Sequence, residues 1–264
     1  MEPEKGSMAH PAEEIGVGRL PEPAAILERI CLLLPPVGQL SGMTITVTAG
    51  PTREALDPIR YLSNHSSGKM GFALAHEARR RGAQVNLISG PTSLPAPPGA
   101  HLKQVESTEQ MRQAVLEQLP ETRVLIMAAA PADFKPRLAR PQKSKKEEAG
   151  GTHTLDLEKT PDILSEIASA KGERIFVGFA LETENGPAHA RRKLQQKNLD
   201  LVVLNHPRPD ADSGMGKEVI QGTIISADGS EETLPVLTKE GMAGVILDWI
   251  QDLLTARTNT PTRT

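Results

Sequence analysis

Strand-like and helix-like segments alternate along the chain from residue 43 onward, and this alternation constrains the fold more than any other feature. Apolar or β-branched runs that predict buried strands lie at 44–48, 84–90, 123–131, 174–180 and 201–205. Helix-period segments separate them, so the sequence predicts an α/β fold with a parallel sheet and right-handed crossovers. Ligands of such sheets bind beyond the carboxyl ends of the strands, where Gly50, Gly90 and Ala128–Ala130 lie.

The segment 44–71 predicts a strand, a polar loop and the start of a helix. A helix N-terminus directs backbone N–H groups and a positive dipole at one spot, which suits phosphate or carboxylate groups. The segment fits neither the dinucleotide fingerprint nor the P-loop, because only Gly68 and Gly71 fall in step with the former. An anion site is the favoured interpretation, and an ordinary strand–helix connection is the alternative.

Residues 132–158 interrupt the alternation with a long basic loop that contains a glycine hinge, and Leu155 and Leu157 follow in a strand-like alternation. Loops of this length inside compact domains are usually functional lids or disordered segments. Lys143, Lys145 and Lys146 form a cluster that could close over a polyanion. A solvated run of charge explains the same composition equally well.

Lys193 and Lys197 lie four residues apart on a helix predicted over 187–198, so both side chains project from one face. Two neighbouring ammonium groups repel each other unless an anion or acid lies between them. A clamp on a triphosphate is one interpretation, and two solvated lysines fit the spacing as well.

The remaining elements are predicted from local signals. Thr160 is the predicted N-cap of a helix whose first residue is Pro161. Alternating runs on either side of Asp228-Gly229 predict a β-hairpin near the C-terminus. Residues 1–22 and 256–264 are polar and aperiodic, and we expect them to be disordered.

Composition excludes several classes of function. The net charge of -3 argues against general binding of nucleic acid or of a membrane surface, since both need a basic excess. The single cysteine, Cys31, excludes an internal disulfide and fits a reducing compartment. The sequence contains neither a long apolar run nor a signal peptide, so the cytoplasm is the expected location.

The motifs at 49–71 identify a family. Ala-Gly-Pro-Thr-Arg-Glu at 49–54 and Ser-Asn-His-Ser-Ser-Gly-Lys-Met-Gly at 63–71 resemble the signature of bacterial phosphopantothenoylcysteine synthetase. That enzyme is the ligase half of a bifunctional protein of coenzyme A biosynthesis. Further stretches that resemble the family follow in order at 127–134, 143–146, 159–163, 178–183 and 193–205.

The resemblance implies a Rossmann-like three-layer α/β fold with a mostly parallel sheet, a C-terminal β-hairpin and a flexible basic flap at about 135–158. The ligase domain would span 43–255. Residues 1–42 would be a disordered lead and short helix that resemble the tail of a flavin-dependent decarboxylase domain, and 256–264 a disordered tail. The flavin-binding body is absent from this sequence, so no FMN is expected in it. The family is homodimeric.

The resemblance also implies the chemistry. The family joins 4′-phosphopantothenate to L-cysteine, and the bacterial type uses CTP: an acyl-cytidylate forms with release of pyrophosphate, and cysteine then displaces CMP. Mg2+ is expected with the triphosphate, without a dedicated set of protein ligands for a metal. The implied partners are therefore CTP, 4′-phosphopantothenate and L-cysteine.

By resemblance, Asn64 and Lys143 are the catalytic residues. Asn64 would position the acyl group and stabilise charge on its oxygen, and Lys143 would neutralise the intermediate. The substrate is expected on Asn64, Ser66, Ser67 and Gly68. The nucleotide is expected on Gly50, Met127, Ala128, Ala129, Asp133, Lys143, Pro161, Asp162, Ile163, Leu164, Phe179, Lys193 and Lys197.

Three other interpretations compete with this one. The chain could be a nucleotide-binding scaffold that has lost turnover, although Asn64 and Lys143 are intact. An NAD(P)-dependent dehydrogenase would share a Rossmann-like sheet but needs the missing glycine fingerprint. A ligase that uses ATP differs only in its choice of base, which the sequence does not decide.

Overall fold

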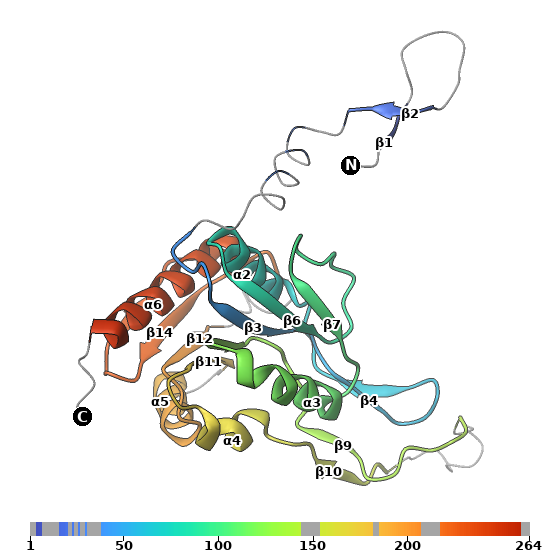
Figure 1. Ribbon diagram of the computed structural model, residues 1–264. Coiled ribbons are helices and arrows are strands. Elements are labelled where there is room, and N and C mark those ends of the chain that lie inside the picture. The colour runs from blue at the N-terminus through green and yellow to red at the C-terminus, as the bar shows by residue number, and fades with distance from the viewer. Residues whose placement is uncertain are drawn as a thin grey trace. The chain divides into compact units, whose positions relative to one another are not determined.

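A computed structural model describes residues 4–6, 16–20, 23, 26, 30, 38–143, 154–181, 185–206 and 217–259 (Figure 1). The chain forms two compact units, residues 1–37 and 38–264. In the first unit, β1 (Glu4–Gly6) pairs antiparallel with β2 (Gly16–Arg19). The sequence predicts disorder here, and the structure places a short ribbon instead.

The second unit is built on an 8-stranded sheet in the order β15-β14-β12-β11-β8-β3-β6-β7. Its strands are β3 (Thr44–Ala49), β6 (Gln84–Ser89), β7 (His101–Gln104), β8 (Val124–Met127), β11 (Ile175–Leu181), β12 (Leu201–Asn205), β14 (Gly222–Ser226) and β15 (Glu231–Thr233). All neighbours from β7 through β12 are parallel, whereas β14 and β15 add an antiparallel edge.

The parallel part has the strand order of a doubly wound fold. Numbered by their succession in the chain, its strands run 3-2-1-4-5-6 across the sheet, which is the Rossmann order. The predicted α/β class and the mostly parallel sheet are confirmed. The edge strand β7 is a difference, since the sequence predicts a loop up to Gly99 and no strand between that loop and Val105. Three of the four residues of β7 are exposed.

Helices cover both faces of this sheet, as Figure 1 shows. They are α2 (Lys69–Arg80), α3 (Thr108–Gln118), α4 (Ile163–Ile167), α5 (Gly186–Gln196) and α6 (Lys239–Asn259), with short 3-10 turns η1 (Leu119–Glu121) and η3 (Ala168–Ala170). One buried cluster joins α2 and α6 to one face, and a second joins α3, α4 and α5 to the other. Alternate residues of β8 belong to different clusters: Val124 and Ile126 to the first, Leu125 and Met127 to the second. The three-layer prediction is therefore confirmed.

Helix α2 approaches β3 closely because glycine occurs where they meet. A Cβ at Gly71 would lie 2.5 Å from the Cβ of Ala49. Gly68, the N-cap of α2, has a φ of 78°, a backbone conformation that glycine adopts without steric cost. The start of α2 is thereby held beside the end of β3.

The described residues of the unit also form three short antiparallel ribbons: β4 (Arg53–Ala55) with β5 (Tyr61–Ser63), β9 (Phe134–Pro136) with β10 (Leu157–Lys159), and β13 (Val219–Ile220) with β16 (Leu237–Thr238). The β9–β10 ribbon forms the base of the predicted flap. Residues 144–153, with Lys145 and Lys146, lie outside the described residues. The predicted hairpin at Asp228-Gly229 is confirmed as β14–β15, which pairs with β12 of the main sheet.

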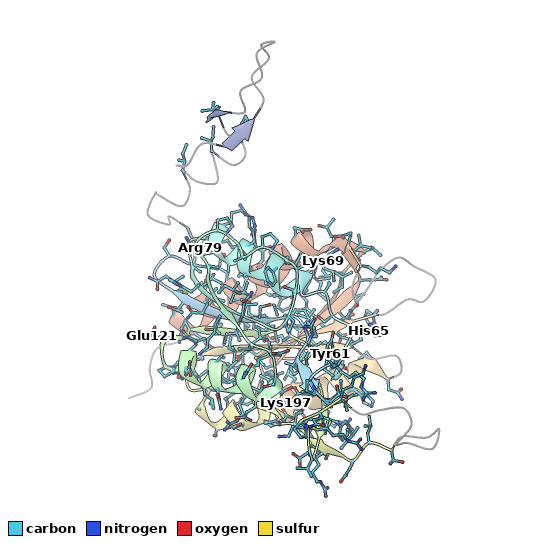
Figure 2. All side chains as sticks on the ribbon, turned by 90° about the vertical axis from the view of Figure 1, so that its right-hand side faces the viewer. Tyr61, His65, Lys69, Arg79, Glu121 and Lys197 are labelled. Atoms are coloured by element: carbon cyan, nitrogen blue, oxygen red, sulfur yellow. The ribbon has the colours of Figure 1, made fainter. Side chains whose placement is uncertain are left out.

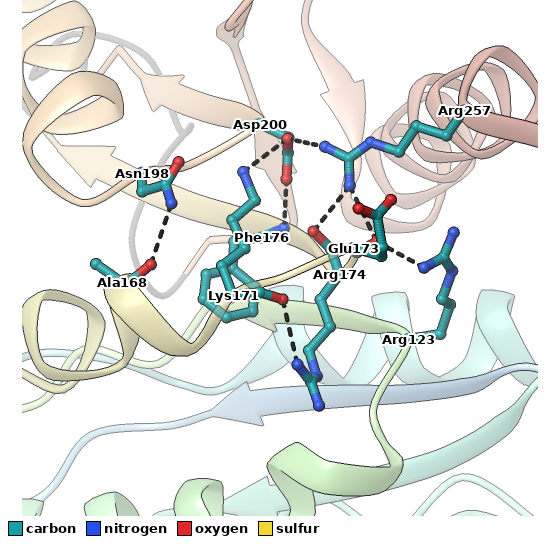
Figure 3. A network of polar contacts seen from close by, with 9 residues as sticks. All are labelled: Arg123, Ala168, Lys171, Glu173, Arg174, Phe176, Asn198, Asp200 and Arg257. Carbon is teal, nitrogen blue, oxygen red and sulfur yellow. Dashed lines mark hydrogen bonds and ion pairs between the residues drawn. The ribbon is translucent and has the colours of Figure 1, made fainter. Parts of the chain in front are cut away.

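Helix α6 continues through residues 256–259, where the sequence predicts disorder. Arg257 explains the difference, because it donates hydrogen bonds to the backbone carbonyls of Glu173 (3.1 Å) and Arg174 (2.9 Å) and pairs with Asp200 (Figure 3). Asp200 is buried and also accepts from Lys171 at 2.8 Å. Within the described residues, no helix combines the length and apolar character that crossing a bilayer requires.

Candidate active site

The candidate site lies at the carboxyl ends of β3, β8 and β11. The chain after β3 runs beside the chain after β8: Pro51 and Ala130 form a parallel bridge, and Ala130 N–H donates to the carbonyl of Gly50 at 2.9 Å. Strands β3 and β8 are the first and fourth of the parallel order, so this is the point where the order of succession reverses. Ligands of doubly wound sheets bind at that point, as the sequence predicts for Gly50 and Ala128–Ala130.

One pocket, which we call pocket A, opens toward α4 and α5 and has a volume of about 320 Å³. It is lined by Met127, Ala129, Pro131, Ala132, Asp133, Phe134, Lys159, Thr160, Pro161, Asp162, Ile163, Leu164, Phe179, Lys193 and Lys197. All residues predicted on the nucleotide side are among them except Gly50, Ala128 and Lys143. The structure thus gathers residues from 127–133, 161–164 and 179–197 around one cavity.

A second pocket, pocket B, has a volume of about 430 Å³. It is lined by Asn64, Ser66, Ser67, Gly68, Lys69, Met70, Ala128, Ala129, Ala130, Pro131, Asp133, Phe179, Ala180, Leu181, Lys193, Asn205, Ile220 and Lys239. This set includes every residue predicted on the substrate side, together with Ala128. Pockets A and B share Ala129, Pro131, Asp133, Phe179 and Lys193, so they adjoin.

The two pockets reach different layers of the molecule. Pocket A includes residues of α4 and α5, whereas pocket B includes the first residues of α2 and α6. In Figure 2, Lys69 at the start of α2 and Lys197 after α5 accordingly lie well apart. The combined site therefore extends across the end of the sheet from one helical layer to the other.

The two lysines predicted to clamp a triphosphate both have protein acceptors. Lys193 Nζ donates to the carbonyl oxygen of Phe179 at 2.5 Å, and Lys197 Nζ donates to Asp162 Oδ1 at 2.9 Å. The sequence shows no acid between the two lysines on their helix. The fold supplies one, because it brings Asp162 to Lys197 although the two residues are 35 positions apart along the chain. Both ammonium groups still line pocket A.

Asp162, not Thr160, caps α4. Its carboxylate accepts a hydrogen bond from Ser165 N–H at 3.2 Å, whereas the Thr160 hydroxyl donates to the carbonyl of Ala132 at 2.5 Å. Burial acts to raise the pKa of Asp162, but the hydrogen bonds from Lys197 and Ser165 outweigh it, so the pKa lies below its ordinary value. The predicted cap is wrong by two residues, because the Thr160 hydroxyl serves the 131–133 turn instead.

Asn64 lies at the rim of pocket B and ties two loops together. Its Nδ2 donates to the carbonyl oxygens of Pro131 at 2.8 Å and Ala130 at 3.4 Å. The amide side chain is therefore fixed beside the residues that the two pockets share. The second of these contacts is at the outer limit of a hydrogen bond and is the weaker.

A buried network of hydroxyls supports the turn behind both pockets. Thr52 Oγ1 accepts from Ala132 N–H at 2.9 Å and contacts Thr108 Oγ1 at 2.8 Å. Thr108 in turn donates its N–H and its hydroxyl to Glu54, both at 2.8 Å. Gly50, which was predicted on the nucleotide side, lies outside the described lining of both pockets and supports Ala130 instead.

Lys143 is exposed and lies outside the described lining of both pockets. The structure therefore does not bring it together with the other predicted nucleotide-side residues. Its segment leaves the sheet through the β9–β10 ribbon, which projects from the body of the unit in Figure 1.

Three polar residues that were not predicted as site residues also line pocket B: Lys69, Lys239 and Asn205. Burial lowers the pKa of Lys239 below its ordinary value, and the Lys69 charge lowers it further, while Glu218 and Glu240 oppose this. One sequence signal could have identified Lys239 as a site residue. The helix dipole disfavours a positive charge at the first position of a helix, so a lysine at that position indicates a role other than helix stability.

Within the described residues, no group of three or more His, Cys, Asp or Glu side chains comes together as a metal site. Two carboxylates, those of Asp133 and Asp162, line pocket A.

Comparison with known proteins agrees with the motifs and the sheet order. Residues 40–254 match the family described as the DNA/pantothenate metabolism flavoprotein C-terminal domain. The coenzyme A biosynthesis bifunctional protein CoaBC of Bacillus subtilis (strain 168) is 42% identical over 256 residues, which is 96% of this chain and 62% of that protein. Its Escherichia coli (strain K12) counterpart is 40% identical over 250 residues, 94% of this chain and 61% of that protein. The chain thus spans less than two thirds of the length of these relatives.

A solved structure has the same fold. The crystal structure of the C-terminal domain of a coenzyme A biosynthesis bifunctional protein CoaBC aligns with a TM-score of 0.71 and 37% identity, over 83% of this chain and 99% of that domain. The ordered motifs, the 3-2-1-4-5-6 sheet and these similarities lead to one conclusion: the chain belongs to the DNA/pantothenate metabolism flavoprotein C-terminal domain family.

Proposed function

We propose that this chain is a phosphopantothenate–cysteine ligase that activates 4′-phosphopantothenate with CTP and then joins it to L-cysteine. The observation that carries the proposal is the pair of adjoining pockets. All residues predicted for the nucleotide except Gly50, Ala128 and Lys143 gather in pocket A, and those predicted for the acid gather in pocket B, although they come from distant parts of the sequence. Family membership, with relatives named for coenzyme A biosynthesis, supports the same activity.

In the first half-reaction, a carboxylate oxygen of the acid attacks the α-phosphorus of CTP. A new P–O bond forms, the bond to pyrophosphate breaks, and pyrophosphate leaves. The attack requires the carboxylate of the acid and the α-phosphate of the nucleotide to lie side by side. The residues that line both pockets are where the two groups would meet. Lys193 lines both pockets, so it is suited to neutralise charge on the phosphate that reacts. Lys197 lines pocket A and not pocket B, so it is suited to the rest of the triphosphate.

In the second half-reaction, the amine of cysteine attacks the acyl carbon. A C–N bond forms, the C–O bond to CMP breaks, and the amine loses a proton. We assign Asn64 to the acyl oxygen: the oxygen would replace the weak 3.4 Å contact between Asn64 Nδ2 and Ala130, while the 2.8 Å bond to Pro131 keeps the amide oriented. We assign Lys143 to the departing CMP, which requires the flap to close over pocket A.

Mg2+ fits this site as a companion of the triphosphate. Mg2+ is commonly held by one or two carboxylates together with substrate phosphates, and Asp133 and Asp162 both line pocket A. When bound, the ion would neutralise triphosphate charge. Asp162 already pairs with Lys197, so Asp133 is the better of the two candidates.

Preference for CTP over ATP, assembly as a homodimer and location in the cytoplasm belong to the same proposal. Backbone groups near Met127–Ala129 are suited to read the base, because these residues are small or apolar and line the pockets. The exposed turn at Asp228 of the β14–β15 hairpin is the proposed dimer contact.

The test is formation of the amide product. Protein is incubated with 4′-phosphopantothenate, L-cysteine and Mg2+, with CTP or ATP, and the product is detected by mass spectrometry. We expect 4′-phosphopantothenoylcysteine to appear, faster with CTP, and to be absent when cysteine is omitted. Folded protein that makes no product with either nucleotide would support a nucleotide-binding scaffold instead.

A further inference from the structure

Thr52 contacts both of the segments that Asn64 joins. Its carbonyl oxygen accepts a hydrogen bond from Ser63 Oγ at 2.7 Å, and Ser63 precedes Asn64 in the chain. Its hydroxyl oxygen accepts from the N–H of Ala132 at 2.9 Å, and Ala132 follows Pro131, whose carbonyl accepts from Asn64 Nδ2 at 2.8 Å. These hydrogen bonds close a ring, so the position of Thr52 fixes both ends of the Asn64 contact.

A buried carboxylate sets the direction of the Thr52 hydroxyl. Thr52 Oγ1 lies 2.8 Å from Thr108 Oγ1, and by geometry either hydroxyl could be the donor. Thr108 directs its single hydroxyl hydrogen to Glu54 Oε1, also at 2.8 Å, because a carboxylate only accepts. The carbonyl of Ala132 is the weaker acceptor for this hydrogen, since it lies 3.4 Å from Thr108 Oγ1. Thr52 therefore donates to Thr108, and its lone pairs are left for the N–H of Ala132.

This chain of hydrogen bonds is buried from end to end. Thr52 is 0% exposed, Thr108 1% and Glu54 5%. Hydrogen bonds are stronger in such surroundings, and donors arranged head to tail polarise one another. Glu54 also accepts the N–H of Thr108, the first residue of α3, at 2.8 Å. The Thr52 hydroxyl is thereby held in one orientation, and with it the turn at 131–133.

The arrangement concerns the reaction because the turn at 131–133 belongs to both pockets. Pro131 and Asp133 line pocket A and pocket B, and Asn64 lines pocket B. Thr52 and Glu54 lie outside the described lining of both pockets. Any contribution of these two residues to the reaction must therefore act through the placement of Asn64 against the turn.

We infer that Thr52 is a positioning residue for amide formation. Oriented by Thr108 and Glu54, it holds the Asn64 amide at the place where the acyl oxygen binds. The inference rests on the proposed function, because that function assigns Asn64 to the acyl oxygen. It gives the Thr-Arg-Glu run at 52–54, which the proposed chemistry does not otherwise use, a part in the reaction.

The test replaces the Thr52 hydroxyl by a methyl group of similar size. Thr52→Val removes the acceptor for the N–H of Ala132, and we expect amide formation to fall about 10- to 100-fold, since a displacement of about 1 Å can cost about 100-fold in rate. Pyrophosphate release without cysteine and the KM for CTP should stay within about threefold, because the nucleotide contacts are unchanged. Thr52→Ser keeps the hydroxyl and should retain most of the activity.

Thr46→Val is the matched control. Thr46 Oγ1 lies 2.6 Å from Thr122 Oγ1, and both residues are buried, so this pair resembles Thr52 and Thr108. Thr46 lies in the first half of β3 and outside the described lining of both pockets. Both valine variants should lower the melting temperature by a few degrees, but only Thr52→Val should slow amide formation. An equal loss of amide formation in the two variants, or no loss in Thr52→Val, would overturn the positioning role.

A double-mutant cycle with Asn64→Ala asks whether Thr52 acts through Asn64. If it does, Thr52→Val should slow amide formation by less than about threefold in a chain that already carries Asn64→Ala. A purely structural role predicts losses that multiply. A double variant that is slower than Asn64→Ala by the full factor seen for Thr52→Val alone would contradict the inference.

Nuclear magnetic resonance separates this inference from the proposed function. If the unmodified chain makes no amide, the ligase proposal fails, and the side-chain amide signals of Asn64, assigned by their loss in Asn64→Ala, then test the positioning role alone. Thr52→Val should shift these signals toward those of a freely rotating amide, whereas Thr52→Ser and Thr46→Val should leave them in place. Signals that stay in place in Thr52→Val, or that shift equally in Thr46→Val, would contradict the positioning role.

Discussion

Asn64 shows how a single residue can serve the fold and the proposed chemistry together. Its Nδ2 joins the loop before α2 to the end of β8 through Pro131 and Ala130. The same amide lines the pocket assigned to the acid. Because the two donor hydrogens are on one nitrogen, an acyl oxygen can take the weaker contact without releasing the stronger.

Asn64→Ala is expected to separate the two half-reactions. Removal of one donor to a developing oxyanion costs roughly 10²- to 10³-fold in rate. Amide formation should fall by that factor, whereas pyrophosphate release from acid and CTP should fall far less. Product assays with and without cysteine measure both.

The control for Asn64→Ala is its thermal unfolding. The residue is exposed, and its loss should lower the melting temperature by only a few degrees. An equal fall in both half-reactions by a folded variant would place Asn64 in binding of the acid and not in amide formation.

Single residues of the site were predictable to the extent that a motif carries them. Asn64, Ser66 and Ser67 follow from the run at 63–71, and the structure places them in one pocket. Lys239 and Asn205 lie in no such run, and their relevance depends on α6 and β12 meeting at pocket B, which a local pattern does not encode. The Lys197–Asp162 pair escaped prediction for the same reason.

At the scale of elements, the contact of α2 with β3 depends on Gly71. Gly71→Ala would place a methyl group 2.5 Å from the Cβ of Ala49 and 2.9 Å from the carbonyl oxygen of Thr48. We expect it to lower the free energy of unfolding by about 1–3 kcal/mol, as overpacking usually does. It should also reduce activity, because Gly68–Met70 at the start of α2 line pocket B.

Gly244→Ala is the matched control for Gly71→Ala. It lies inside α6, and the nearest atom to its added Cβ is a nitrogen of Arg81 at 4.0 Å. Alanine has the higher helix propensity, so this variant should be more stable by roughly 0.5–1 kcal/mol. Chemical denaturation compares the two, and a Gly71→Ala variant as stable as the unmodified chain would contradict the packing described for α2.

An ion-pair cluster joins α2 to α6. Arg81 donates to Glu77 at 2.7 Å, to Asp248 at 2.6 Å and to the carbonyl of Gly244 at 2.9 Å. The Glu77 side chain is 12% exposed. Burial acts to raise the pKa of Glu77, but hydrogen bonds from Arg80 and Arg81 prevail and hold the pKa below its ordinary value.

Glu77→Gln should therefore cost stability in a way that depends on pH. A carboxylate whose pKa is lowered by folding stabilises the folded state above its unfolded pKa, and this contribution is lost as the pH falls through the folded pKa. We expect a loss of about 1–2 kcal/mol at pH 7 that shrinks in acid, as the pH falls through the lowered pKa of Glu77. Denaturant unfolding at pH 7 and pH 3 measures it.

Glu117→Gln provides the comparison for Glu77→Gln. Glu117 pairs with Lys103, and both side chains are about half exposed. Exposed pairs contribute little, so this variant should change stability by less than about 0.5 kcal/mol at either pH. A Glu77→Gln loss that persists at pH 3 would show that packing, and not charge, accounts for the effect.

Elements were predictable where the hydrophobic period is strong. The strands β3, β6, β8, β11 and β12 follow from apolar runs, and the structure buries each of them between the helical layers. Strand β7 was not predicted, because it is an exposed edge strand and its polar sequence resembles that of a loop. The end of α6 was not predicted either. Its last turn is stabilised by the contact of Arg257 with Asp200, and these residues are 57 positions apart in the sequence.

At the scale of the whole molecule, the alternation of elements fixes a doubly wound sheet, and the order of that sheet fixes where a site can lie. Pockets A and B open at that place, one toward each helical layer. This arrangement gives the proposed reaction what it needs: two substrates approach from opposite layers and meet at a wall that both pockets share. The position of Lys143 is the part that the described structure leaves outside this arrangement.

The central claim, that the shared wall is where the acid attacks a nucleoside triphosphate, is tested most directly by pyrophosphate release in the absence of cysteine. Protein, Mg2+ and CTP are mixed with and without 4′-phosphopantothenate, and ATP replaces CTP in a parallel series. The account predicts release that requires the acid, does not require cysteine and is faster with CTP. Release that is independent of the acid, or no release with either nucleotide from folded protein, would contradict it.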